Sequence, residues 1–150
     1  MSFLLLNLKI LRAESKQAEQ ISNMILPLAI EHFKPIIASF SSDSIASLID
    51  NPAFNYYIAI IDDALCGIMA LRDNKHIYHL FVTTKYQRRG IARRLWEHAK
   101  LAAEQLGNEG VFTVNSSMNA VQVYQHLGFN IESTPQEKNG VSFIPMQYGG

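Results

Sequence analysis

Three apolar segments separated by short polar turns occupy the middle of the chain. The segments are residues 56–61, 65–71 and 76–82, and the turns are residues 62–64 and 73–75. Parallel strands need a crossover connection of a dozen or more residues, so turns this short allow only antiparallel neighbours. The chain is therefore predicted to contain at least three consecutive antiparallel strands.

A strand and two helices are predicted ahead of this region. Residues 3–11 are mostly aliphatic and predict a first strand. An apolar stripe then predicts a helix through Ala18, Ile21, Ile25 and Leu28. Pro27 is expected to kink or end that helix, because proline removes a backbone donor. Serines in residues 41–44 offer N-caps for a short second helix that stops before Pro52.

Helical periodicity returns directly after the three strands. Apolar side chains recur on one helix face, and Gly107 provides the stop: Ile91, Leu95, Ala99, Ala102 and Leu106. A short strand at 111–114 is followed by a last helix, which is expected to begin at Ser116-Ser117 and to end at Gly128. Residues 129–132 and 141–146 predict closing strands.

This order of elements, β-α-α-β-β-β-α-β-α-β-β, predicts one mixed α/β domain over residues 1–150 with helices on both faces of a sheet. Thirteen basic and thirteen acidic residues balance, which gives no reason to expect nucleic acid or a membrane surface as a partner. Cys66 is the single cysteine, so no disulfide or cysteine-based metal site forms within the chain, and a cytoplasmic setting is expected. Whether the chain forms a homodimer stays open.

Positive charge is nevertheless concentrated at one strand-to-helix junction. Six of the thirteen basic residues fall within residues 85–100, where Glu97 alone opposes them: Lys85, Arg88, Arg89, Arg93, Arg94 and Lys100. The first amides of a helix have no internal partner and attract phosphate, and Gly90 with the small Ala92 would leave the backbone accessible. A solvated, arginine-rich helix start with a capping glycine is an equally good interpretation of charge and spacing alone.

Two motifs in this part of the chain resemble one protein family. Residues 79–95, HLFVTTKYQRRGIARRL, resemble the acetyl-CoA motif of the GCN5-related N-acetyltransferases (GNAT), in which a hydrophobic strand precedes Q/R-x-x-G-x-G/A. Residues 119–129, NAVQVYQHLGF, are similar to the family's A-x-x-x-Y-x-x-x-G-F block. The resemblance implies a mixed, mostly antiparallel sheet that splays open after the fourth strand, residues 76–82.

The resemblance also implies acetyl-CoA as co-substrate, without a metal. The end of the fourth strand would bind the pantetheine arm through Leu80, Phe81 and Val82, with Phe81 or Val82 stabilising the oxyanion. The next loop and helix start would bind the pyrophosphate through Gln87, Arg88, Arg89, Gly90, Ile91, Ala92 and Arg93. Asn115 or Asn119 would contact the cofactor in place of the family's asparagine, where this chain has Ser117. We expect Ser117 to cap the last helix.

The resemblance assigns Tyr124 as donor of a hydrogen bond or proton to the departing thiolate; a tyrosine that only covers the core is the alternative. The fourth strand has no carboxylate, so His76 and His79 are the candidates for the general base, although both could be structural. Strand alternation predicts that they lie on opposite faces. A water chain could also deprotonate the amine.

The resemblance implies that the acceptor amine is held by the first two helices, their connection and the loop between the last strands. The pool of candidate contacts is Glu31, His32, Phe33, Tyr56, Tyr57, Tyr78 and Phe143. Carboxylates in this region are scattered, which disfavours a polycationic acceptor. We therefore expect an N-acetyltransferase that moves an acetyl group to a primary amine of a small molecule or peptide, by direct attack in a ternary complex. A catalytically inactive acyl-CoA-binding sensor or regulatory module is the alternative.

Overall fold

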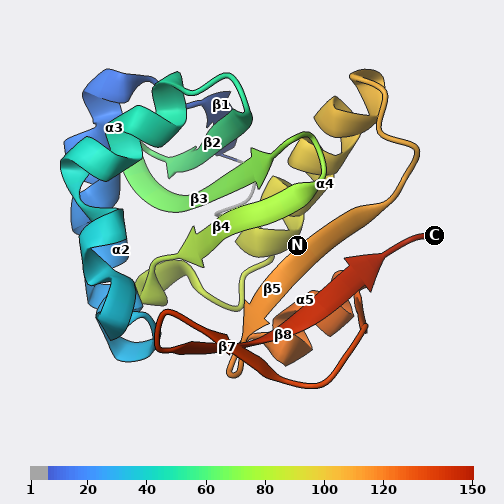
Figure 1. Ribbon diagram of the computed structural model, residues 1–150. Coiled ribbons are helices and arrows are strands. Elements are labelled where there is room, and N and C mark those ends of the chain that lie inside the picture. The colour runs from blue at the N-terminus through green and yellow to red at the C-terminus, as the bar shows by residue number, and fades with distance from the viewer. Residues whose placement is uncertain (1–6) are drawn as a thin grey trace.

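The computed structural model describes residues 7–150, and one curved sheet organises them (Figure 1). Its strands are β1 (Leu8–Arg12), β2 (Phe54–Ile61), β3 (Ala64–Arg72), β4 (His76–Val82), β5 (Phe112–Ser117), β6 (Asn130–Ile131), β7 (Gln136–Lys138) and β8 (Val141–Tyr148). The helices are α2 (Ala18–His32), α3 (Ser42–Asp50), α4 (Ile91–Gln105) and α5 (Val121–His126), with 3-10 turns η1 (Ser15–Gln17), η2 (Lys34–Phe40) and η3 (Thr84–Tyr86).

The strand order is β1-β2-β3-β4-β5-β8-β6, with β7 paired to β8. Every neighbouring pair is antiparallel except β4 and β5, which run parallel. The predicted mixed, mostly antiparallel fold and the three central antiparallel strands are confirmed. Of the predicted first strand, residues 8–11 lie in β1, while Phe3 to Leu6 fall outside the described residues.

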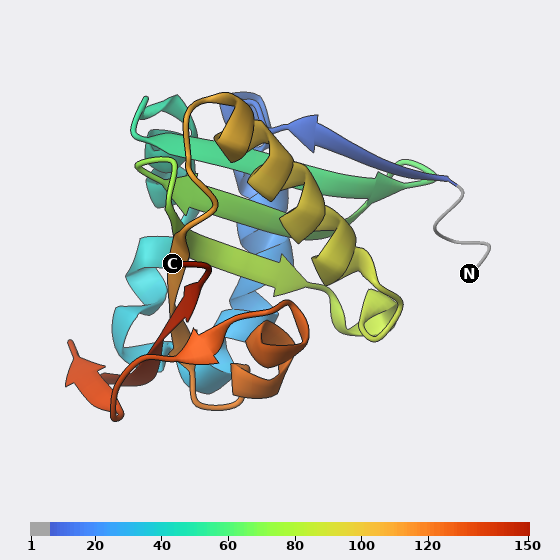
Figure 2. The same cartoon turned by 90° about the vertical axis from the view of Figure 1, so that its right-hand side faces the viewer.

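Helices cover both faces of the sheet, as predicted. On one face α2 and α3 bury an apolar cluster with β2 and β3 that includes Ile21, Ile25 and Ile45. On the other face α4 and α5 bury a second cluster around Trp96, whose ring contacts those of Phe112, Phe129 and Tyr148. The sheet thus separates two cores (Figures 1 and 2).

Pro27 was expected to kink or end its helix, and it does not end helix α2. The helix continues for five residues to His32. Ile25 and Ala29 flank the proline, and both are fully buried against the sheet. Their packing offsets the hydrogen bond that the proline removes.

The predicted start of the last helix at Ser116-Ser117 is wrong. Both serines belong to β5, where Ser116 pairs with Ile144 and Ser117 with Phe143 of β8. The helix α5 begins only at Val121, and its N-cap Ala120 has no side-chain cap. Ser117 instead donates from Oγ to Asn119 Oδ1 over 2.7 Å. Pairing with β8 and burial of Ser116 override the local capping preference of serine.

Candidate functional site

The sheet opens between β4 and β5. Their parallel pairing consists of His76 with Thr113 and Ile77 with Val114, at the start of β4. Beyond that point β5 stays paired with β8 on its other side, whereas β4 continues along β3. In Figure 2, β5 and β8 run across the direction of β4. The second half of β4 therefore has one free edge, as the predicted splay requires.

Hydrogen-bond alternation decides which amides of β4 face this opening. The Thr83 amide donates to the Cys66 carbonyl over 3.0 Å, so in this antiparallel ladder Phe81 shares its hydrogen bonds with Ile68 of β3. The backbone groups of Leu80 and Val82 point the other way, into the opening. Of the two amides expected to stabilise an oxyanion, the register therefore favours Val82 and directs Phe81 to β3.

Gln87 fixes the loop that leaves β4. Its Nε2 donates to the Val82 carbonyl over 2.9 Å, so this side chain supports the strand end. Two residues after it adopt positive φ, Arg88 at 62° and Gly90 at 83°. Gly90 is the N-cap of α4 and has no side chain to satisfy the first amides of the helix. A 15-residue helix thus begins with uncapped N–H groups beside the opening.

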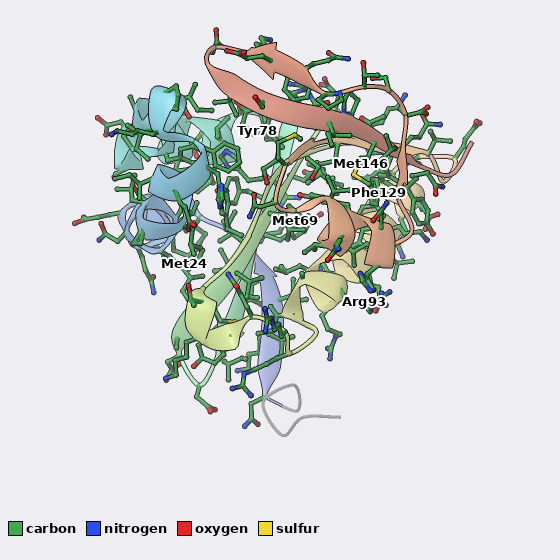
Figure 3. The ribbon with its side chains drawn as sticks, turned by 90° about the horizontal axis from the view of Figure 1, so that it is seen from below. Met24, Met69, Tyr78, Arg93, Phe129 and Met146 are labelled. Atoms are coloured by element: carbon green, nitrogen blue, oxygen red, sulfur yellow. The ribbon has the colours of Figure 1, made fainter. Side chains whose placement is uncertain are left out.

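The predicted phosphate-binding residues divide into two groups. The cleft is lined by Gln87, Arg88, Gly90, Ile91, Ala92 and Arg93, while Arg89 is exposed and does not line it. Arg93 also has a structural contact, because its Nη2 donates to the His126 carbonyl over 2.6 Å. Figure 3 shows Arg93 on α4 close to α5. The bond joins the start of α4 to the end of α5.

Tyr124 lies on α5 with its ring buried and packed against Phe129, the centroids 5.7 Å apart. Burial raises the pKa of its phenol above the ordinary value. Among residues 7–150 its hydroxyl has no hydrogen-bond partner, and Tyr124 lines the cleft. Asn115, Ser117 and Asn119 line the same cleft. The hydroxyl is thus protonated and free to donate.

A single cleft of about 1270 Å³ joins the free edge of β4, the start of α4 and Tyr124. Of the candidate acceptor contacts, Glu31, His32, Phe33, Tyr78 and Phe143 line it. Tyr56 lies behind it, and Tyr57 belongs to the opposite core, where its ring contacts His98. The sequence reasoning missed Ile36, Phe40, Arg72 and Lys138, which come from segments without a motif.

The two candidate histidines lie on the same face of β4, and the prediction of opposite faces is wrong. The register of β3 and β4 shifts between His79 and Ile77, which leaves Tyr78 as an extra residue in a β-bulge. Tyr78 contacts Phe54 and His79 contacts Tyr56, both on the α2 face, while Ile77 lies in the α4 core. His76 precedes Ile77 and so also faces α2.

Both histidines are poor bases at neutral pH. Burial lowers the pKa of His79 to about 3, and its Nδ1 lies 3.2 Å from the Tyr56 hydroxyl. Burial, with a smaller contribution from the Arg72 charge, lowers the pKa of His76 to about 4. His76 Nδ1 lies 2.8 Å from Thr113 Oγ1. Each imidazole is neutral near pH 7 but accepts a proton weakly.

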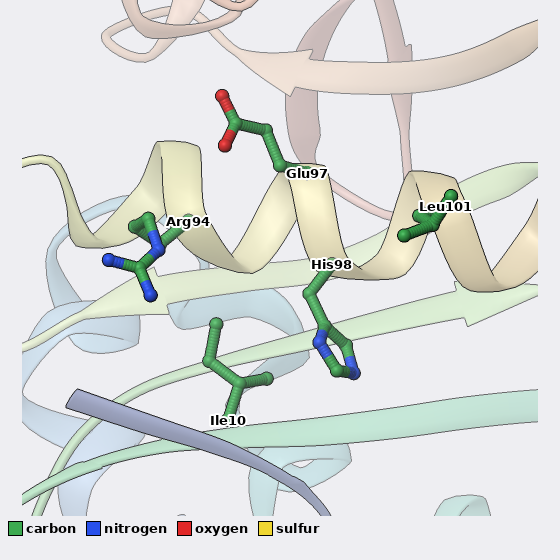
Figure 4. Close-up of a pocket in the computed structure, with 5 residues that line it drawn as sticks. All are labelled: Ile10, Arg94, Glu97, His98 and Leu101. Atoms are coloured by element: carbon green, nitrogen blue, oxygen red, sulfur yellow. The ribbon is translucent and has the colours of Figure 1, made fainter.

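A second, smaller hollow of about 300 Å³ lies between β1 and α4 (Figure 4). It is lined by Ile10, Arg94, Glu97, His98 and Leu101. It contains neither the free edge of β4 nor Tyr124, so the larger cleft is the candidate active site. Within residues 7–150, no helix has the length and apolar character needed to cross a bilayer.

Solved structures with the same fold cover almost the whole chain. The GCN5-related N-acetyltransferase of Rhodopseudomonas palustris is 17% identical with a TM-score of 0.80, over 93% of each chain. The PaiA N-acetyltransferase of Thermoplasma acidophilum, in complex with coenzyme A, is 16% identical with a TM-score of 0.79, over 98% of each chain. The apo form of Escherichia coli YjaB is 21% identical with a TM-score of 0.69, over 95% of this chain and 98% of that one.

No curated protein matches the sequence. A family model, described as the acetyltransferase (GNAT) domain, matches residues 12–149. That range includes the free edge of β4, the start of α4 and Tyr124. The predicted family is confirmed: this chain belongs to the GNAT acetyltransferases.

Proposed function

We propose that the protein transfers an acetyl group from acetyl-CoA to a primary amine of a small molecule or peptide, by direct attack in a ternary complex. The observation that supports this best is the Tyr124 hydroxyl, protonated and without a partner among the described residues, in the same cleft as the free edge of β4 and the uncapped start of α4. A module that only binds acyl-CoA would need the free edge of β4 and the uncapped start of α4, but it would not need the Tyr124 proton donor.

The residues present fit coenzyme A. The uncapped amides of Ile91, Ala92 and Arg93 with the left-handed Gly90 form a cradle for the pyrophosphate, and Arg88 adds positive charge. The free edge at Leu80 has the geometry to pair with an amide group of a pantetheine arm, whereas the Val82 carbonyl already accepts from Gln87 Nε2. The PaiA structure contains coenzyme A in the same fold.

The reaction forms a bond between the amine nitrogen and the acetyl carbon, breaks the carbon–sulfur bond, and moves one proton from the amine to solvent and one to the sulfur. We assign the Val82 amide to the negative charge that develops on the carbonyl oxygen. Tyr124 donates its proton to the leaving sulfur and regains one from solvent. The raised pKa of the phenol keeps it protonated at neutral pH but also makes it a weak acid, so the proton moves only as the departing sulfur becomes a basic thiolate.

The amine must be neutral to attack. His76 and His79 were the candidates for a general base, but their lowered pKa values make them weak acceptors of an ammonium proton. The cleft is open to solvent and lined by polar groups, among them Asn115 and Ser117. We therefore propose that the amine loses its proton to water in the cleft, without a dedicated histidine base.

Thiol release with acetyl-CoA across amino acids, peptides, small amines and polyamines tests the proposal. We expect release that depends on one class of primary amine, and calorimetric binding of acetyl-CoA that weakens when Arg88→Ala and Arg89→Ala are combined. Binding without release for any amine would support the sensor or regulatory module instead. Absence of binding would contradict both.

A further inference from the structure

His79 sits in an aromatic cage on the α2 side of the cleft. Its ring stacks on Phe40 with centroids 5.1 Å apart and an interplanar angle of 29°. Phe81 meets it edge-on at 5.9 Å, and Tyr78 lies 4.8 Å away. The side chain is 6% exposed. A buried imidazole in such surroundings stays neutral, so one ring nitrogen carries a proton and the other does not.

Tyr56 decides which nitrogen carries the proton. Its hydroxyl is buried, and within residues 7–150 its one side-chain partner is His79 Nδ1 at 3.2 Å. Burial raises the pKa of this phenol, so the hydroxyl remains a donor. If Nδ1 were protonated, the phenol proton would have no acceptor in an apolar core. Donation from Tyr56 to Nδ1 satisfies both groups and places the imidazole proton on Nε2.

The Nε2 atom is directed at the cleft. Asn74 Oδ1 and Thr83 Oγ1 are the buried side-chain polar atoms that lack a partner in the described part of the chain. His79 Nε2 is not among them, although no partner for it occurs there, so the atom remains accessible. His79 lines the cleft, and its accessible atom therefore lies on the cleft side. The cage presents a single neutral N–H in an aromatic wall.

We propose that His79 Nε2–H binds a carbonyl or carboxylate oxygen of the acceptor amine, with Tyr56 as the positioning residue that fixes this tautomer. The inference rests on the proposed function only in taking the occupant of this part of the cleft to be the acceptor. His79 is then a recognition group and not the base.

The charges and rings around the cage define the class of acceptor. Glu31 is the one carboxylate among the described residues that line the cleft. Arg72 and Lys138 also line the cleft, and Arg72 Nε lies 3.6 Å from Asp73 Oδ2. A polycation would find a single lining carboxylate here, whereas an aromatic or aliphatic body packs on Phe33 and Phe40. The acceptor class is an apolar amine that carries a carbonyl or carboxylate oxygen, of the amino-acid or peptide type.

Nitrogen-15 NMR of the histidine rings in the full chain tests the tautomer without any substrate. We expect His79 to show a protonated Nε2 and an unprotonated Nδ1, with signals assigned by their loss in His79→Gln. His126 provides an internal contrast, because its Nδ1 lies 2.7 Å from the Gln122 carbonyl, which can only accept. Tyr56→Phe should abolish the preference at His79 while the fold is kept. A proton on Nδ1 of wild-type His79 would overturn the proposal.

Matched acceptors test recognition. Phenylalanine and phenethylamine share a ring and a primary amine, and only phenylalanine has the oxygen. We expect kcat/KM for phenylalanine, divided by kcat/KM for phenethylamine, to fall by about 3- to 10-fold in His79→Leu, because one hydrogen bond is lost. The ratio should recover in part in His79→Gln. Phenylalanine and phenethylamine differ in amine basicity, but this difference is the same for the wild type and the His79 variants, so it cancels when their ratios are compared. An unchanged ratio, or spermidine as the best acceptor, would overturn the proposal.

Binding separates this inference from the proposed function. Phenylalanine should shift the His79 Nε2 signal in the wild type, even in a protein that never releases thiol. A shift without turnover would retain the recognition site and contradict the acetyl transfer. Turnover of simple amines with no shift at His79 from any oxygen-bearing amine would retain the transfer and contradict the recognition site.

Discussion

Arg93 Nη2 donates a hydrogen bond of 2.6 Å to the main-chain carbonyl of His126, and so links the first turn of α4 to the last turn of α5. The first of these helices begins at the proposed phosphate-binding residues, and the second carries Tyr124. The two motifs are about thirty residues apart in sequence, yet one side chain holds them together (Figure 3). A change at Arg93 should therefore affect both binding and the position of the Tyr124 hydroxyl.

Arg93→Ala should lower kcat by about 3- to 10-fold, since it removes a charge-assisted hydrogen bond that places α5. Steady-state kinetics at saturating acetyl-CoA measure this. Arg94→Ala is the matched control, because Arg94 carries the same charge but faces the smaller hollow beside β1. Equal loss in both variants would mean that charge, and not the link to α5, is responsible.

Gly90→Ala should weaken acetyl-CoA binding by at least about tenfold, because its φ of 83° suits glycine and an alanine would reorient the first amides of α4. Calorimetry measures the binding. Gly107→Ala is the control: its φ is 106° and an added Cβ would meet no atom within 4 Å, but it lies at the opposite end of α4. Both variants should lose about 1 kcal/mol of stability, and only Gly90→Ala should lose affinity.

Tyr124→Phe should reduce kcat on the order of 100-fold while acetyl-CoA still binds, because the ring that packs on Phe129 is kept and only the proton donor is lost. Rapid thiol detection with a good acceptor measures the effect. Tyr148→Phe removes another phenol, one outside the cleft, and should be near wild type. Full turnover in Tyr124→Phe would exclude the tyrosine as donor.

Acid should destabilise the protein through its buried histidines. The pKa of His79 is lowered to about 3 in the folded state, against about 6.5 in the unfolded chain, so the unfolded state binds the proton more readily between these values. The contribution of His79 to the free energy of unfolding is therefore fully present above about pH 6.5. Below that value the free energy of unfolding falls by up to about 1.4 kcal/mol per pH unit. His76, with a pKa of about 4, acts in the same direction.

Urea unfolding at several pH values between about 7 and 4 measures this slope. The double variant Tyr56→Phe with His79→Leu removes the buried proton acceptor and leaves no orphaned phenol. In this double variant the free energy of unfolding should depend less steeply on pH than in the wild type. The difference should correspond to at most one proton bound on unfolding. Identical slopes would show that His79 does not titrate with unfolding.

Much of the fold could be predicted because its signals are local. Turns of two and three residues force β2, β3 and β4 to be antiparallel, and β4 occupies the predicted residues 76–82. The predicted stripe packs α4 on the sheet through Ile91, Leu95 and Ala99, whereas its last member, Leu106, is exposed beyond the end of the helix. Gly90 and Tyr124 could be identified for the same reason, since each belongs to a short motif with fixed spacing.

Where local preference and long-range pairing compete, only the tertiary structure decided. Ser116 and Ser117 prefer a helix cap by themselves, but β8 pairs with them as strand residues. The alternation that placed His76 and His79 on opposite faces holds for a regular strand, and the bulge at Tyr78 shifts it by one residue. A bulge depends on the partner strand, so the sequence of β4 alone does not reveal it.

The sequence by itself therefore determined the order of the elements and the positions of the two motifs, and it identified Gly90 and Tyr124 as candidate site residues. The tertiary structure decided the direction of each group in the cleft. It directs the amides of Leu80 and Val82 into the opening, and it brings Tyr56 from β2 against His79 of β4. These relations depend on register and on contacts between distant segments, whose free energies arise only when the sheet and its two cores are assembled.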